Sequence, residues 1–377
     1  MKMSFKKTIG LLHLWLGLSS GIIVFIIAIT GCLYAFQVEI QNITQEYRFV
    51  TEQQSPFLPP SQLLKIAQKQ LPDKTIHAIK YNGKTDAAEA IFFHYEPTYY
   101  YTTYLNPYSG KVLKTVDNES GFFHFILDGH YYLWLPEKIG QVVVGTATLI
   151  FLFLIISGFI LWFPKNKNAV KQRLWFKWKN GMKWKRKNYD LHNITGFYVL
   201  IIAILFAVTG LVWGFQWFAS SYYKVLGGEK SLIYEEPVSK PFKEQKNTSR
   251  EPLDAIWYKM AVEYPKAQSI EIHPPETDSS SIAVNANFDK ETYSKIDYRY
   301  FDQYSLKEIN VDHLWGRNKE DKIADSLMKM NYDIHTGGIF GLAGKVFAFL
   351  ISLLIASLPI TGFYIWWGRK NKTITRT

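Results

Sequence analysis

Four histidines recur at equivalent places beside the long apolar stretches of this 377-residue sequence. His13 and His192 lie near the beginning of the first and third stretches, whereas His130 and His335 precede the second and fourth. Imidazole nitrogen binds haem iron well, and helix bundles hold cofactors through side chains on facing helices. Ionisable residues within a membrane span are costly and usually functional. We therefore interpret His13 with His192, and His130 with His335, as metal-ligating pairs that each supply two axial imidazoles to one b-type haem.

The single cysteine, Cys32, excludes several other kinds of chemistry. One cysteine can form neither a disulfide framework nor a Cys-x-x-Cys-His attachment site, so covalently attached haem is excluded. A metal in this protein must therefore be held by histidine, methionine or carboxylate. No catalytic residues are predicted, because the sequence contains no catalytic triad motif and no phosphate-binding glycine loop.

Glycines recur with the histidines. Gly31 lies 18 residues beyond His13, which is about 27 Å along a helix axis. This places it at the depth of the His130 pair, and the same argument pairs the other glycines with histidines across the membrane. Small residues usually serve close helix packing, which is the alternative interpretation. We predict that four glycines leave room for the flat macrocycles: Gly31, Gly158, Gly210 and Gly362.

The ligand that precedes the second apolar stretch has a competitor. His124 lies six residues before His130, and either could bind the metal. We choose His130 because its spacing to Gly158 matches the spacing from His335 to Gly362 within one residue. A ligating imidazole is usually oriented by a hydrogen-bond acceptor. Two aspartates are predicted for this role, each two residues before its histidine: Asp128 and Asp333.

The elements that must position these residues are membrane helices. Apolar residues make up 48% of the sequence, yet the mean hydropathy is only −0.07, which indicates spanning helices combined with sizeable soluble parts. A span needs roughly 20 consecutive, mostly apolar residues. Four stretches meet this requirement: Ile9–Phe36, Ile139–Phe163, Leu191–Phe218 and Ile339–Trp367.

The net charge of +11 is a topology signal. Residues 164–189, the first seven residues and the tail together carry 17 of the 43 lysines and arginines, with no acidic residue among them. Short basic flanks stay cytoplasmic, and these three fall on the same side of a path with four spans. We therefore expect both termini in the cytoplasm, contact of the basic loop with anionic membrane lipid, and no nucleic-acid partner.

The two halves of the chain repeat. The motif His13-x3-Gly17 corresponds to His192-x3-Gly196, and Ser157-Gly158 corresponds to Thr361-Gly362. Each soluble part shows one amphipathic helix, at 61–67 and at 251–257, followed by alternating segments typical of strands. Four strands are predicted: Ala90–Tyr95, Tyr100–Leu105, Ser281–Asn287 and Ile296–Phe301. The fold class is thus an α-helical membrane protein with four transmembrane helices from a duplicated helix–domain–helix unit, with two small α+β domains.

These motifs, with the segment Tyr332-Asp-Ile-His-Thr-Gly-Gly-Ile-Phe-Gly341, resemble the PepSY-associated transmembrane proteins over nearly the whole chain. That family includes di-haem ferric-siderophore reductases of bacterial inner membranes. The resemblance implies two periplasmic PepSY-like domains, two b haems, and electron transfer from a quinol or a cytoplasmic reductant to ferric siderophore, with release of ferrous iron. Two alternatives remain open: a quinol-linked cytochrome with another acceptor, and a haem-free regulatory or scaffolding protein.

The predicted order of segments follows from the spans and the resemblance. It is transmembrane helix 1 (1–38), periplasmic PepSY-like domain 1 (39–138), helix 2 (139–163), basic cytoplasmic loop (164–189), helix 3 (190–218), periplasmic PepSY-like domain 2 (219–338), helix 4 (339–367) and cytoplasmic tail (368–377).

Overall fold

The computed structural model describes residues 4–164, 167–240 and 251–374. Of the predicted basic segments, Lys2, Lys165 and Arg376 lie outside these residues. The chain divides into two compact units, each built from separate stretches of sequence. The helical unit contains residues 1–37, 125–222 and 333–377, and the sheet unit contains residues 38–124 and 223–332.

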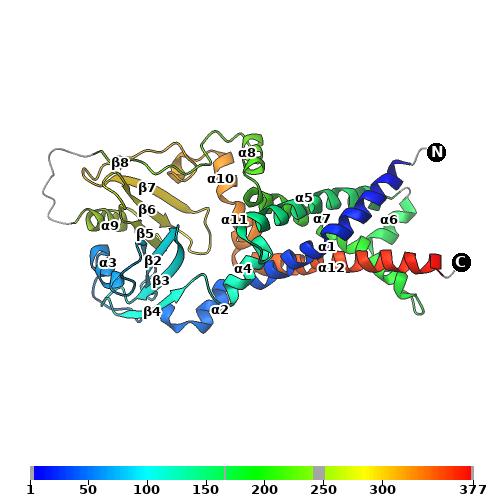
Figure 1. Cartoon of the computed structure of the whole chain (residues 1–377), viewed down its shortest axis with the longest axis horizontal. Coiled ribbons are helices and arrows are strands. Elements are labelled where there is room, and N and C mark those ends of the chain that lie inside the picture. Colours follow the sequence, from blue (N-terminus) through cyan, green and yellow to red (C-terminus); the bar gives the residue numbers. More distant parts are fainter. Residues whose placement is uncertain (1–3, 165–166, 241–250, 375–377) are drawn as a thin grey trace. The chain divides into compact units, whose positions relative to one another are not determined.

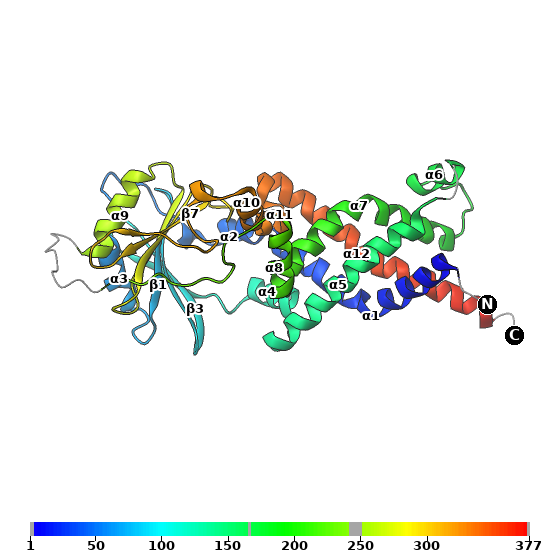
Figure 2. The same cartoon turned by 90° about the horizontal axis from the view of Figure 1, so that it is seen from above.

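The helical unit is built on four long apolar helices: α1 (Phe5–Tyr34), α5 (Glu137–Trp162), α7 (Trp184–Gly214) and α12 (Gly341–Ile374). Each is long and apolar enough to cross a membrane. Figures 1 and 2 show that the beginning of α1 and the end of α12 lie at the same end of this bundle, which we call the terminal end; the opposite end is the distal end. The four predicted spans are therefore confirmed as helices.

Two helix boundaries differ from the prediction. Helix α7 begins at Trp184, inside the predicted basic loop, and α12 continues to Ile374, inside the predicted tail. The loop also contains a short helix, α6 (Lys167–Leu174). Lysine and arginine are good helix formers. The apolar pattern therefore marks the part of a helix that suits a bilayer, whereas the helix itself extends into the charged flank.

The bundle is arranged so that α1 packs against α5 and α12, and α7 packs against the same two helices. Helices α1 and α7 thus lie at opposite corners. The interior of the middle section is apolar and contains Val24, Val199, Ala203 and Ile355. Large apolar side chains also point outward, such as Ile22 (64% exposed) and Ile201 (69% exposed). Apolar residues inside and outside are the pattern of helices surrounded by lipid.

The sheet unit contains one continuous antiparallel sheet of eight strands in the order β4-β3-β2-β1-β5-β6-β7-β8. The first half of the chain supplies α3 (Pro60–Gln68), β1 (Ile76–Tyr81), β2 (Ala88–Tyr95), β3 (Thr98–Leu105) and β4 (Val112–Asp117). The second half supplies α9 (Pro252–Glu263), β5 (Ser269–His273), β6 (Ser281–Asn287), β7 (Ile296–Asp302) and β8 (Glu308–Ile309). All four predicted strands and both predicted helices are confirmed, with ends shifted by a few residues.

The prediction of two separate soluble domains is wrong, because strands β1 and β5 join the two halves. They pair antiparallel, with Ile79 opposite Ile272 and Lys80 opposite Glu271. Helices α3 and α9 pack on one face of the sheet (Figure 1), and a single core runs beneath both. Asp254 of α9 accepts hydrogen bonds from the backbone N–H (2.9 Å) and the hydroxyl (2.7 Å) of Ser61 at the start of α3. Each half alone would expose an unpaired strand edge and half of the core, so the halves fold as one body.

Shorter helices connect these elements: α2 (Gln37–Thr44), α4 (Phe122–Tyr132), α8 (Gln216–Val225), α10 (Ile323–Lys329) and α11 (Asn331–Thr336). Two of them are important for the site, because α4 carries His130 and α11 carries His335.

Candidate functional site

The first histidine pair lies toward the terminal end of the bundle. His13 is on α1 and His192 is on α7, which occupy opposite corners, so both side chains reach toward the bundle axis. Their ring centres lie 6.4 Å apart, and the ring planes are nearly perpendicular at 84°. We call these two residues the terminal pair.

The second pair lies at the distal end. His130 on α4 and His335 on α11 have ring centres 6.2 Å apart and an angle of 65° between their planes. We call them the distal pair. His124, the competitor for His130, is exposed and lies six residues earlier on α4. The structure therefore brings His130 to His335, as the repeat predicts.

A hydroxyl group on a neighbouring helix orients each ring of the terminal pair. His13 Nδ1 lies 2.9 Å from Ser157 Oγ on α5, and His192 Nδ1 lies 3.0 Å from Thr361 Oγ1 on α12. Each ring also has a backbone carbonyl partner three residues before that hydroxyl, at Leu154 and at Leu358. Both hydroxyls belong to the same half of the chain as the histidine that they contact.

The distal pair repeats this arrangement. His130 Nδ1 lies 3.2 Å from Thr30 Oγ1 and 2.9 Å from the carbonyl oxygen of Ile27, both on α1. His335 Nδ1 lies 2.8 Å from Thr209 Oγ1 on α7, and the Phe206 carbonyl is its backbone partner.

The prediction that aspartates orient the distal ligands is therefore wrong for Nδ1. Asp128 and Asp333 were chosen for this role by closeness in sequence, but hydroxyls and carbonyls of the spanning helices contact that nitrogen. Ser157, Thr30, Thr209 and Thr361 are the residues that sequence reasoning missed. The signal was present, because each directly precedes one of the four predicted glycines.

The four glycines lie at the depths that the sequence predicts, but the space they leave is next to imidazole rings. A Cβ atom at Gly158 would lie 3.3 Å from His13 Cε1, and one at Gly31 would lie 3.2 Å from His130 Cε1. At Gly362 and Gly210 the distances to Cε1 of His192 and His335 are 3.3 and 3.4 Å. These contacts are tighter than ordinary van der Waals packing. Each glycine thus allows one imidazole to lie against its helix.

The spacing of each pair fits two imidazoles that ligate one metal ion. Metal–nitrogen bonds of ~2 Å, with the ring centres about 1 Å further, place the two centres about 6 Å apart. Both pairs have this spacing. Within residues 4–164, 167–240 and 251–374, no group of three or more histidine, cysteine or carboxylate residues could hold a metal ion. Each pair offers two imidazoles, the number that axial ligation of one macrocycle requires.

Histidines of the sheet unit belong to a different environment. The rings of His77 and His273 lie 4.8 Å apart, and His273 Nε2 lies 3.1 Å from Glu271 Oε1. Burial lowers the pKa of His77. Burial favours the neutral acid for Glu271, but the hydrogen bond and the charge from His273, with the charge of Lys80, outweigh it and hold its pKa at about 2. These groups stabilise one another in the seam between β1 and β5.

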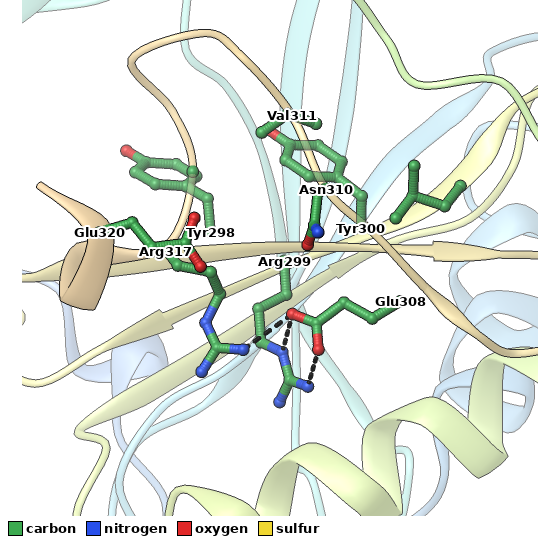
Figure 3. Close-up of a pocket in the computed structure, with 10 residues that line it drawn as sticks. Tyr298, Arg299, Tyr300, Glu308, Asn310, Val311, Arg317 and Glu320 are labelled. Carbon is green, nitrogen blue, oxygen red and sulfur yellow. Dashed lines mark hydrogen bonds and ion pairs between the residues drawn. The ribbon is translucent and has the colours of Figure 1, made fainter.

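A small pocket of the sheet unit is lined by charged side chains that already have partners (Figure 3). Arg299 binds Glu308 through two hydrogen bonds, of 2.9 and 2.6 Å, and Arg317 donates to the same carboxylate at 2.8 Å. Arg299 also pairs with Glu263. An anionic ligand would have to displace these carboxylates, so the pocket is a structural ion-pair network.

Comparison with known proteins identifies the family of this chain. No curated protein shows significant similarity to this chain. Residues 11–369 match the family described as the PepSY-associated TM region, which covers nearly the whole sequence. With its four apolar helices, the chain is a multi-pass membrane protein that belongs to the PepSY-associated TM family.

Proposed function

We propose that this protein is a di-haem b electron-transfer protein of the bacterial inner membrane that reduces ferric siderophore in the periplasm and releases ferrous iron. The observation that carries the proposal is the pair of two-histidine sites, one toward each end of the bundle, with ring centres 6.4 and 6.2 Å apart. His13 and His192 would hold one haem, and His130 and His335 the other. Haem b, when bound, supplies one-electron redox chemistry.

The residues around the sites suit such a cofactor. The middle section of the bundle is filled by the apolar cluster around Val24 and Ile355. At the distal pair, the rings of Phe206 and Trp213 lie 5.8 and 5.5 Å from that of His335. A low dielectric and the identity of the axial ligand are the main controls that a protein has over haem potential. Four neutral imidazoles in an apolar bundle provide both controls.

The proposed substrate follows from coordination chemistry. Oxygen ligands of a chelator hold ferric iron far more tightly than ferrous iron, so one electron loosens the complex without hydrolysis of the chelator. The acceptor is therefore a ferric siderophore near the distal pair, and the donor is a quinol or a cytoplasmic reductant near the terminal pair.

A purified sample tests the cofactor and then the substrate. We expect two haems per chain and the visible spectrum of low-spin haem with two imidazole ligands. The dithionite-reduced protein, freed of excess reductant under argon, should be oxidised by ferric siderophore, with ferrous iron trapped by a coloured chelator. A haem-free protein contradicts the proposal in favour of a regulatory or scaffolding role. Oxidation by a quinone but not by any ferric chelate indicates the quinol-linked cytochrome instead.

Sidedness is tested separately. We propose that both termini are cytoplasmic, because short flanks rich in lysine and arginine stay inside. Reporter fusions after residues 80 and 280 should be active in the periplasm, and a fusion near residue 175 in the cytoplasm. A cytoplasmic signal from residue 80 or 280 would contradict this orientation.

A further inference from the structure

The four hydroxyls are placed to accept hydrogen bonds from the histidines. A serine or threonine hydroxyl has a single proton, and each of these hydroxyls directs it to a carbonyl of its own helix. Ser157 Oγ donates to Leu154 O (3.1 Å), and Thr209 Oγ1 donates to Leu205 O (2.6 Å). Thr30 and Thr361 likewise donate to carbonyls three and four residues earlier. Toward the imidazole, each oxygen is therefore an acceptor.

The protonated nitrogen of each ring follows from this. An Nδ1 that faces a hydroxyl acceptor and a backbone carbonyl must carry the proton. At His130 this is direct, because the Ile27 carbonyl, 2.9 Å from Nδ1, can only accept. The other three rings also have a backbone partner three residues before the hydroxyl. We therefore assign the Nδ1–H tautomer to all four histidines, which leaves the lone pair on Nε2.

We infer that the Ser/Thr-Gly pairs are positioning residues for the haem ligands, an inference that rests on the proposed function. The hydroxyl, with the carbonyl one turn earlier, fixes the tautomer and presents Nε2 to the iron, and the glycine lets the ring lie against the helix. An acceptor at the remote nitrogen makes imidazole a stronger donor to the metal, which stabilises ferric over ferrous haem. The hydroxyls therefore lower the potential of the haem that they serve.

Each Ser/Thr-Gly pair contacts a histidine of its own half of the chain, whereas each proposed haem is held by one histidine from each half. Removing one hydroxyl should therefore change one haem and spare the other. The spared haem serves as an internal control for folding.

The test replaces each hydroxyl by a side chain of similar shape: Ser157→Ala, Thr361→Val, Thr30→Val and Thr209→Val. Reduction potentials are measured by spectroelectrochemistry, and haem retention by titration with an apo-protein acceptor. The first two variants should raise the potential of the terminal haem, and the last two that of the distal haem. Affected haems should bind about 10- to 100-fold more weakly. Ser157→Thr and Thr361→Ser should restore wild-type values.

A matched control lies one turn before Thr361. Ser357 Oγ donates to Leu354 O at 2.6 Å within the same helix, and Ser357→Ala should change neither potential. A wild-type protein with two haems whose potentials and affinities survive all four substitutions would contradict this inference alone. Equal loss of both haems in a variant contradicts a local positioning role. A haem-free wild-type protein contradicts the proposed function and the inference together.

Discussion

The two halves of the chain meet twice, and they meet differently in the two units. In the sheet unit the halves contact each other directly, through the pairing of β1 with β5 and through the bond between Ser61 and Asp254. In the helical unit, facing histidines of the two halves keep their ring centres more than 6 Å apart. The seam of the sheet is closed by strand pairing and a shared core. The seam of the bundle is closed by the packing of α1 on α12 and of α5 on α7, and two histidine pairs face each other across it.

The polar groups of the two units also differ in their hydrogen-bond partners. In the sheet unit, Asp254 is hydrogen-bonded to Ser61, and Arg299 to Glu308. In the bundle, each of the four hydroxyls contacts Nδ1 of one imidazole, and in our proposal Nε2 binds the haem iron. In our proposal, a haem completes the seam of the bundle, whereas the seam of the sheet needs no ligand.

The largest expected effect comes from removing one of the proposed haem ligands in the bundle. His13→Ala or His192→Ala should abolish the terminal haem and leave most of the distal one, and His130→Ala or His335→Ala should do the reverse. Haem content per chain and the visible spectrum report this. His124→Ala is the control and should keep both haems. If His124→Ala loses the distal haem while His130→Ala keeps it, the pairing described above is wrong.

A smaller effect should follow from withholding the ligand. A ligand present at 100 times its Kd stabilises the folded state by about 2.7 kcal/mol, or about 100-fold. In protein made without haem, backbone amides around residues 154–158 and 358–362 should exchange with solvent about 100-fold faster, as measured by hydrogen–deuterium exchange. Strands β1 and β5 should exchange at the same rate with and without haem. Equal changes in both regions would remove the distinction between the seams.

The contribution of the Ser61–Asp254 bond to the seam of the sheet is tested by Asp254→Ala. This change leaves the Ser61 N–H and hydroxyl without their buried acceptor, which should cost about 2–3 kcal/mol. Urea unfolding followed by the fluorescence of Trp257, in the same core, measures it. The matched control is Glu251→Ala at the start of the same helix, because the Glu251 ion pair with Lys65 is exposed and should contribute about 0–1 kcal/mol. Haem content should not change in either variant.

The smallest effect concerns Glu271 in the same seam. Its pKa is about 2 rather than the ordinary 4.5. The stability that this carboxylate contributes is therefore fully present above pH 4.5 and is lost as the pH falls from about 4.5 to about 2. Glu271→Gln should cost about 1 kcal/mol at pH 7, reduced from the value for a fully buried charge because the side chain is 23% exposed. The variant should also unfold with a weaker pH dependence in this window; an unchanged acid-unfolding curve would contradict this assignment.

The features that could be predicted from the sequence are those marked by a regular spacing of apolar residues or by the repeat between the two halves. Four spans, two amphipathic helices and four strands follow from hydrophobic spacing, and the choice of His130 over His124 follows from the match between the two halves. Fusion of the soluble domains could not be predicted, because the β1 to β5 pairing joins residues almost 200 positions apart and β5 is only five residues long. The partners of Nδ1 were missed for a related reason, since they lie on neighbouring helices and not beside the histidines in sequence.

Helices α1 and α7 each carry a histidine of one site and a threonine of the other, so the helix fixes the distance between the two sites. Helix α1 carries His13 and, seventeen residues later, Thr30; α7 carries His192 and, again seventeen residues later, Thr209. This interval spans about 25 Å, and one inserted residue would rotate everything beyond it by about 100°. Substitutions between the histidine and the threonine change packing. An insertion or deletion between them would turn one of the two side chains away from its site. The interval in α1 and α7 therefore cannot vary in length, whereas the turns of the sheet unit can.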